Sequence, residues 1–148
     1  MIPRTHAREL LRDIGTLDDP VIDLGEGALA LAALDRPDVA PDRYRDHIQL
    51  LSEDVRHALA IGKDLRTALA DVVLGAHGYS GDTLTYDDIQ NANLMSVIDR
   101  KKGLPVSLGI LFIQVARAQG CEAVGLNFPG HFLIRLGDGG ERIIVDPF

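Results

Sequence analysis

Hydrophobic residues in the first hundred positions recur at three- and four-residue steps, the pattern of amphipathic helices. The clearest stripe follows Pro41, a residue that suits the first turn of a helix. It is formed by Tyr44, Ile48, Leu51, Val55 and Leu59. Similar patterns predict shorter helices at 10–14, 28–34 and 65–73.

The end of this helical part contains a loop and one more helix. Residues 75–86 are rich in glycine and serine and predict an ordered loop. Asp87 or Asp88 is then expected to cap a helix that carries Leu94, Val97 and Ile98. Gly103 and Pro105 end that helix.

A strongly apolar segment follows and changes the period of the chain. It predicts a helix from about Ser107 to Gln119, which Gly120 stops. Alternating patterns then predict strands at 121–126, 132–136 and 142–145. Gly-Asp-Gly-Gly at 137–140 predicts a hairpin turn, because glycine tolerates positive φ.

These patterns predict an α+β fold with a helical N-terminal part and a central helix packed on a small antiparallel sheet. The helical part covers about 1–100, and the central helix and sheet cover about 103–148. A length of 148 residues, 46% of them hydrophobic, suits one compact domain over 1–148.

Net charge and cysteine content indicate which partners and which cellular compartment to expect. The formal net charge of −7 argues against nucleic-acid binding, which needs a basic surface. The basic run at 100–102 is typical of a solvated helix end. No apolar stretch approaches the ~20 residues that span a bilayer, so no membrane contact is expected. A single cysteine favours the reducing cytoplasm.

Three residues carry candidate chemistry: Ser107, His131 and Asp146, in the order nucleophile, histidine, aspartate. A nucleophile at a helix start gains from the dipole and from free amides, which also favour an oxyanion. A histidine on the next strand could accept the proton, and a carboxylate on the following strand could orient the ring. Each also has a structural alternative: a helix cap, a strand residue and a turn opener before proline.

Other residues are weaker candidates for a catalytic, metal or cofactor site. Cys121 follows the stop of the central helix, the wrong end for activation by the dipole, and suits a core position. His6, His47, His57 and His77 have no metal-binding spacing. The glycines form no phosphate or dinucleotide loop. No metal and no cofactor are therefore expected.

Several ordered motifs resemble a known family. They are IDLGEGALALAALDRPD (22–38), NANL (91–94) with VIDR (97–100), GLPVSLGILFIQVARAQG (103–120), NFPGHFLIR (127–135) and VDPF (145–148). Over about 20–148 the chain resembles the transglutaminase-like superfamily, in particular its SirB-type bacterial branch. The resemblance implies a papain-like core and, residue by residue, places the family's cysteine, histidine and aspartate at Ser107, His131 and Asp146.

If these three residues form a catalytic site, Asn91 is a candidate for polar support of the oxyanion. Serine at the cysteine position is a trait that the SirB-type branch shares. Members of that branch usually continue past Asp-Pro-Phe into helical, tetratricopeptide-like repeats. The chain is thus either part of a longer protein or a short relative, and the sequence leaves both open.

Three hypotheses about function follow. A serine hydroxyl is far less acidic than a thiol and depends on base assistance. The first hypothesis is therefore a non-catalytic domain, a pseudoenzyme that binds a protein or peptide partner or regulates one. The alternative is a serine-dependent hydrolase or acyltransferase with a Ser-His-Asp triad, and a purely structural module is the third. The oligomeric state stays open.

Overall fold

The computed structural model describes residues 23–129, 131–138 and 141–148. The helix expected at 10–14 lies outside the described residues. The α-helices are α2 (Leu24–Asp35), α3 (Asp42–Ala60), α4 (Leu65–Leu69), α5 (Leu94–Arg100) and α6 (Pro105–Ala118). A π-helix, η2 (Ala70–Ala76), and a 3-10 helix, η3 (Ile89–Ala92), join them. The strands are β1 (Ser80–Gly81), β2 (Lys102–Gly103), β3 (Ala123–Phe128), β4 (His131–Asp138) and β5 (Glu141–Val145).

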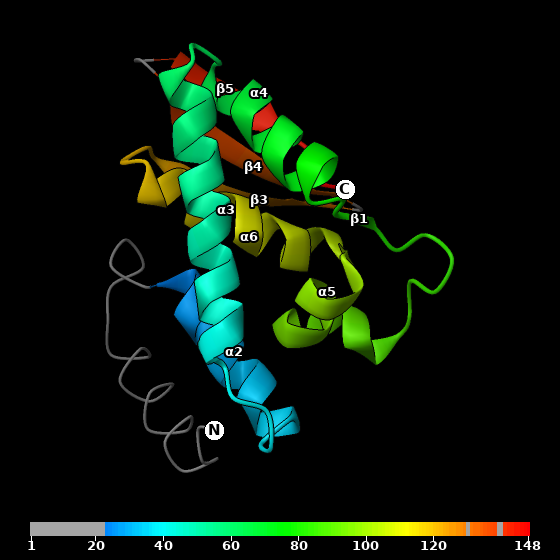
Figure 1. Ribbon diagram of the computed structural model, residues 1–148. Helices are drawn as coiled ribbons and strands as arrows, with labels where there is room; N and C mark the ends of the chain where they lie inside the picture. The colour runs from blue at the N-terminus through cyan, green and yellow to red at the C-terminus, as the bar shows by residue number, and fades with distance from the viewer. Residues whose placement is uncertain (1–22, 130, 139–140) are drawn as a thin grey trace.

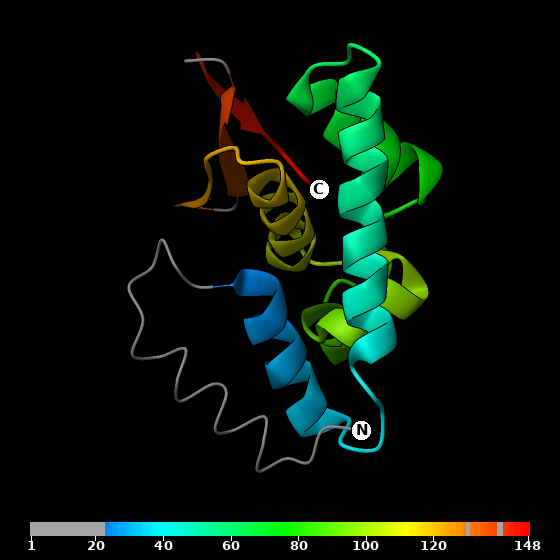
Figure 2. The same cartoon turned by 60° about the vertical axis from the view of Figure 1, so that its left-hand side comes forward.

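Helix α6 lies at the centre of the fold, between the three-stranded sheet and the long helix α3 (Figures 1 and 2). The sheet is antiparallel in the order β3-β4-β5. One face of α6 covers it, and α2, α3 and α4 pack against the remaining faces of the helix. This arrangement confirms the predicted α+β class, with a helical part preceding a small sheet.

The buried stripe of α3 is confirmed. Tyr44, Ile48, Leu51 and Val55 are buried, and Leu59 is partly buried against the same core. The segment 65–73 is also helical, as predicted. It changes there from the α-helix α4 to the π-helix η2. A segment of seven residues is too short for its hydrophobic spacing to distinguish a π-helix from an α-helix.

The predicted loop at 75–86 is only partly correct. The helix runs on to Ala76, and Ser80 and Gly81 pair in parallel with Lys102 and Gly103. This two-residue ladder joins segments about twenty positions apart, which no local pattern reveals. It brings the chain before α5 next to the chain before α6 (Figure 1).

Two helix starts also differ from the prediction. Asp88 caps the short helix η3, whereas Asn93 caps α5 by accepting from Ser96 N at 3.2 Å. Helix α6 starts at Pro105 rather than Ser107, because proline at the first helical position needs no N–H partner. Ser107 therefore lies inside the first turn and is not a cap. Strands β3 to β5 match the three predicted segments with shifted ends.

The ring of Phe132 fills the space between α6 and β3. A Cβ on Gly109 of α6 would lie 2.3 Å from this ring, and a Cβ on Gly125 of β3 would lie 2.5 Å from it. The ring thus occupies a slot that two glycines leave open. Ile134 and Leu136, which share its face of β4, are fully buried.

Gly109→Ala is expected to destabilise the fold by about 1–3 kcal/mol, because the added methyl group overpacks the slot that holds Phe132. The gain in helix propensity, about 1 kcal/mol, offsets only part of this cost. Urea unfolding measures the difference. The double variant Gly109→Ala, Phe132→Leu should be more stable than Gly109→Ala alone. If the losses of the two single variants were additive, the Phe132 ring would not depend on the space beside Gly109.

Candidate functional site

Ser107 lies in the first turn of α6 and its side chain is buried. Its hydroxyl donates a hydrogen bond of 2.6 Å to the carbonyl oxygen of Asn91. The N–H of Leu104 points to the same carbonyl at 3.4 Å. The hydroxyl proton of Ser107 is therefore engaged with the backbone of η3.

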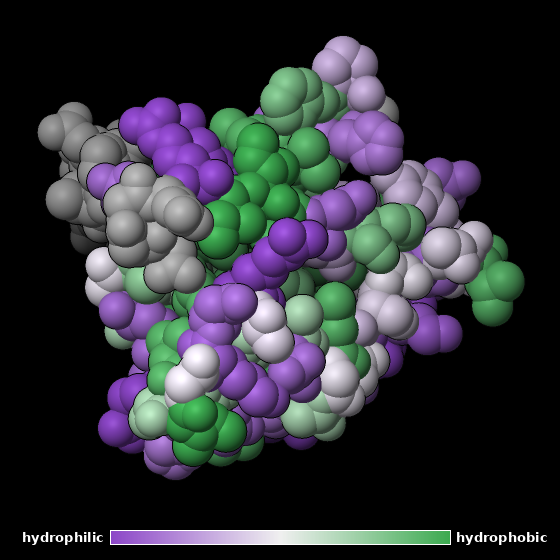
Figure 3. Space-filling view, turned by 90° about the horizontal axis from the view of Figure 1, so that it is seen from above, coloured by the Kyte–Doolittle hydropathy of each residue, from purple (hydrophilic) through white to green (hydrophobic). Residues whose placement is uncertain are grey.

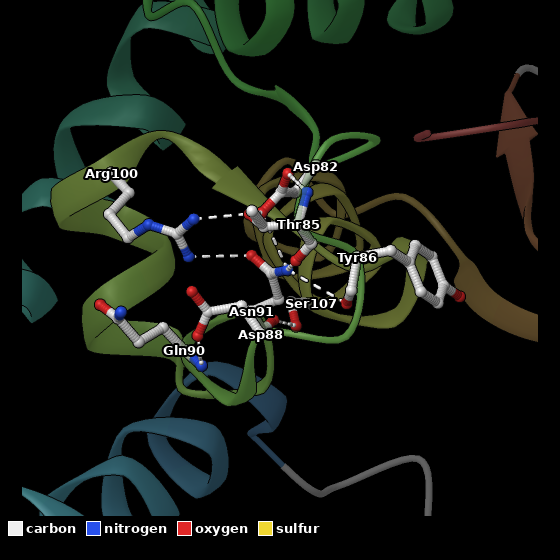
Figure 4. A network of polar contacts seen from close by, with 8 residues as sticks. All are labelled: Asp82, Thr85, Tyr86, Asp88, Gln90, Asn91, Arg100 and Ser107. Carbon is white, nitrogen blue, oxygen red and sulfur yellow. Dashed lines mark hydrogen bonds and ion pairs between the residues drawn. The ribbon is translucent and has the colours of Figure 1, made fainter.

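Behind Ser107, the side chain of Asn91 is the centre of a buried polar network (Figure 4). Its amide N–H groups donate to Asp82 Oδ2 at 3.0 Å, to the Thr85 carbonyl at 2.8 Å and to the Tyr86 carbonyl at 3.2 Å. Its amide oxygen accepts from Arg100 Nη1 at 2.9 Å. The Asn91 amide is thus committed to the loop and to Arg100, so its proposed oxyanion support stays a prediction.

Asp82 is the charged member of this network, and only 2% of its side chain is exposed. The hydroxyl and N–H of Thr85 both donate to it, and Arg100 forms an ion pair with it at 3.1 Å. Hydrogen bonds from Thr85, followed by those from Asn91 and Arg100, hold the pKa of Asp82 well below its usual range. The network orders the loop between β1 and η3.

Because of Asp82, the stability of the fold is expected to depend on pH in the acid range. Because folding lowers the pKa of Asp82, its contribution is full above the unfolded pKa of about 4 and is lost as the pH falls further. Asp82→Asn is expected to lower the free energy of unfolding at pH 7. It should also make that free energy depend less on pH below about 4. Thermal unfolding from pH 7 to pH 2 measures both effects.

Asp87→Asn is the matched control, because Asp87 is exposed on the same loop and the variant removes the same charge. Loss of stability at pH 7 should be confined to Asp82→Asn. If the stability of Asp82→Asn fell with acid pH as steeply as that of the natural chain, Asp82 would not be the source of this pH dependence.

His131 is the first residue of β4 and is exposed. It pairs with Phe128, and its neighbour Phe132 packs against α6. Side chains alternate between the two faces of a strand, so His131 is expected on the face away from α6 and from Ser107. The sequence pattern placed His131 on the correct strand but did not indicate its face.

Asp146 follows the last residue of β5 and is exposed. Its Oδ1 accepts from the N–H of Phe148 at 2.9 Å, the local turn bond expected of aspartate before proline. Within the described residues, no hydrogen bond or ion pair joins Ser107, His131 and Asp146. The triad therefore stays a prediction, with its members bonded elsewhere or exposed.

Sequence analysis did not identify Asp82, Thr85 and Arg100 as parts of the site. Arg100 was interpreted as a solvated helix end, yet its guanidinium reaches the buried carboxylate of Asp82. The two residues are 18 positions apart and meet only because β1 pairs with β2. No local signal in the sequence predicts that pairing.

Two further findings bear on function. Across the described ranges, no cluster of three or more histidine, cysteine, aspartate or glutamate residues could hold a metal ion. Nor does any helix of these ranges have the length and apolar character needed to cross a membrane.

The comparison with protein families confirms the superfamily that the motifs suggest. A family model described as the transglutaminase-like superfamily matches residues 42–148, most of the chain. The chain belongs to the transglutaminase-like superfamily. The matched region runs from α3 to the end of the sheet and includes the whole network around Ser107.

Relatives of this transglutaminase-like chain are bacterial and animal proteins. A UPF0162 protein of Xylella fastidiosa (strain Temecula1) is 32% identical over 142 residues, covering 94% of this chain and 50% of the relative. A UPF0162 protein of Vibrio cholerae is 33% identical over 135 residues, covering 88% and 50%. F-box only protein 21 of Mus musculus is 34% identical over 70 residues, covering 47% and 11%.

The chain thus spans about half the length of the bacterial relatives that it matches over most of its own sequence. No solved structure matches the chain.

Proposed function

We propose that this transglutaminase-like domain belongs to the SirB-type branch and is non-catalytic, serving to bind or regulate a partner. The observation that supports this proposal most strongly is the hydrogen bond from Ser107 to the carbonyl of Asn91 at 2.6 Å. A nucleophilic serine has to transfer its proton to a base, whereas this hydroxyl donates its hydrogen bond to a backbone carbonyl, which cannot act as that base.

The chemistry of serine adds to this argument. A thiol with a pKa near 8.5 can be converted to thiolate by a helix start and an imidazole. A hydroxyl group cannot, so it depends on a base within about 2.6–3.2 Å at the moment of attack. A site shaped for the larger sulfur would also position an alkoxide poorly, and ~1 Å of misplacement costs about a hundredfold in rate.

Active-site labelling tests the proposal against the serine-hydrolase alternative. The protein is incubated with a fluorophosphonate probe at pH 7–8, and the intact mass is measured for the natural chain, Ser107→Ala and His131→Ala. We expect no adduct at residue 107 and no turnover of simple esters or amides above the Ser107→Ala background. An adduct at Ser107 that disappears in His131→Ala would establish a serine-dependent enzyme instead.

The ordered loop beside Ser107 offers a surface for a partner. Leu84 is 87% exposed, Ile89 is 83% exposed and Tyr86 is half-exposed, although the loop is fixed by the buried network. Hydrophobic surface is visible where this loop projects at the right-hand edge of Figure 3. The exposed carboxylate of Asp87 lies between Tyr86 and Ile89 in the chain. An apolar surface with a carboxylate among its apolar side chains fits a polypeptide that carries basic side chains beside apolar ones.

Selection from a random 12-residue peptide-display library tests this partner. We expect enrichment of sequences with an apolar residue flanked by lysine or arginine, and loss of binding to the Leu84→Ser, Ile89→Ser double variant. Leu31→Ser is the matched control, because Leu31 is 58% exposed on α2. Enriched peptides that bind the double variant equally well would contradict the surface, as would self-association of the chain that buries this loop.

A further inference from the structure

Strand β3 forms one edge of the three-stranded sheet (Figure 1). Its six residues, AVGLNF, pair with β4 without a bulge and include neither a charged residue nor proline. The sequence of the opposite edge strand, β5, begins with Glu141 and Arg142 and continues into Asp146 and Pro147. Charged residues, proline and bulges are the features that keep an edge strand from pairing with another chain. The sequence of β5 has such features, and that of β3 lacks them.

The backbone of β3 presents hydrogen-bonding groups on its outer side. The N–H of Gly137 donates to the carbonyl of Glu122 at 2.9 Å, so the backbone groups of every second residue from Glu122 onward point to β4. Those of Gly125 and Asn127 therefore point away from the sheet. Both residues are exposed, and within the described part of the chain their outward groups have no hydrogen-bond partner. An N–H and a carbonyl at each residue can thus pair with an added strand.

The side chains on the outer face of β3 are apolar. Ala123 is buried in the core, so the alternate residues Val124, Leu126 and Phe128 lie on the face of the sheet that α6 does not cover. Val124 and Leu126 are half-buried, and Phe128 is 48% exposed. An added strand with apolar side chains at alternate positions would contact them, and such cross-strand pairs stabilise a sheet.

A cavity of about 570 Å³ lies at the start of β3, and arginines supply most of its charge. The described residues that line it include Arg117, Arg135 and Arg142. They include a single carboxylate, that of Glu122. Arg117 Nε donates to the Ala123 carbonyl at 3.0 Å, which fixes this arginine at the edge. Arg135 and Arg142 form no ion pair with any residue that the structure describes. The cavity therefore suits a carboxylate of another molecule.

We propose that the edge of β3 binds an extended segment of a partner protein, antiparallel to β3, with apolar side chains at alternate positions and acidic residues at its C-terminal end. The backbone of this segment pairs with Gly125 and Asn127. The antiparallel direction, the more stable one per residue, brings its C-terminal end beside Ala123. There Arg135 and Arg142 bind its carboxylates. This surface lies on the sheet and not on the loop between β1 and η3, so the inference goes beyond the proposed function and does not depend on it.

Peptide binding to the full chain tests the proposal. The probe is a fluorescein-labelled ten-residue peptide that alternates valine and threonine and ends in two glutamates. We expect saturable binding by fluorescence anisotropy. The same peptide with two lysines in place of the glutamates should bind several-fold more weakly, because like charges would meet at the arginines. Absence of saturable binding by the glutamate peptide, or equal binding of the lysine peptide, would overturn the proposal.

Asn127→Pro tests the edge itself. Proline removes the outward N–H of residue 127 but no bond to β4, so β3 should still form. Ile144→Pro is the matched control on β5. Ile144 lies opposite Arg135, whose backbone groups point to β3, so the N–H of Ile144 also points outward. We expect Asn127→Pro to abolish peptide binding and Ile144→Pro to retain it, with thermal unfolding showing that both variants fold. Equal binding by the two variants would overturn the proposal.

Arg142→Gln tests the acidic end of the segment without changing the β3 backbone, and it decides alone if Asn127→Pro does not fold. It should weaken binding of the glutamate peptide several-fold and reduce the difference between the two peptides. Arg56→Gln, which removes the same charge from an exposed position on α3, should change neither. Equal effects of the two variants would contradict the role of the arginines.

Sedimentation velocity of the natural chain alone tests the other occupant of this edge, a second copy of the chain. We expect a monomer of 16.0 kDa at all concentrations. Self-association that Asn127→Pro abolishes would assign the edge of β3 to a second copy and overturn the proposal.

Discussion

Replacing Asn91 with leucine is expected to lower the free energy of unfolding by at least about 3 kcal/mol, because it breaks the buried network at its centre. The Asn91 side chain has no exposed surface and bonds to Asp82, Arg100 and two loop carbonyls. Leucine has a similar volume but leaves these groups without their partner. Urea unfolding at pH 7 measures the loss.

Gln90→Ala provides the control for this prediction. Gln90 precedes Asn91 in η3 but is exposed, so its truncation should change stability by no more than about 0.5 kcal/mol. If Asn91→Leu were as mild as Gln90→Ala, the network would contribute little, and the loop would need another explanation for its order.

Leu111→Ala is expected to cost about 2–5 kcal/mol, because it opens a cavity on the buried face of α6. Leu111 has 0% exposure and lies one turn after Ser107. Ser107→Ala should cost only about 1 kcal/mol, the contribution of its one hydrogen bond to Asn91 O. The midpoints of urea unfolding should therefore rank Leu111→Ala well below Ser107→Ala.

Val106→Ala is the control on the same helix, because Val106 is 49% exposed. It should change stability by about 0.5 kcal/mol or less. If Ser107→Ala proved more destabilising than Leu111→Ala, the hydroxyl would be part of a larger network, and the assignment of the buried face of α6 would be wrong.

The parts of the fold that follow a local period were predictable from the sequence. The stripe from Tyr44 to Val55 gave α3, and the apolar run after Pro105 gave α6. Alternation and the glycine-rich turn gave the three strands. In each case one short segment contains the whole signal, because burial on one face imposes the period of the element.

The pairing of β1 with β2 was not predictable, since two residues carry no periodic signal. The buried network depends on that pairing, so Asp82 and Arg100 were not recognised as partners. The order of Ser107, His131 and Asp146 was visible in the sequence, but side-chain direction was not. Whether a histidine faces the helix or solvent depends on a register of one residue, which the pattern around Gly130 leaves undetermined.

The most direct test of a non-catalytic site is a crystal structure that shows where the Ser107 hydroxyl donates. We predict that Ser107 Oγ lies within hydrogen-bond distance of the Asn91 carbonyl, 2.6 Å in the present structure, with no ring nitrogen of His131 in reach. A His131 ring nitrogen at about 2.6–3.2 Å from Ser107 Oγ, with Asp146 bonded to the other ring nitrogen, would contradict this proposal and establish an assembled triad.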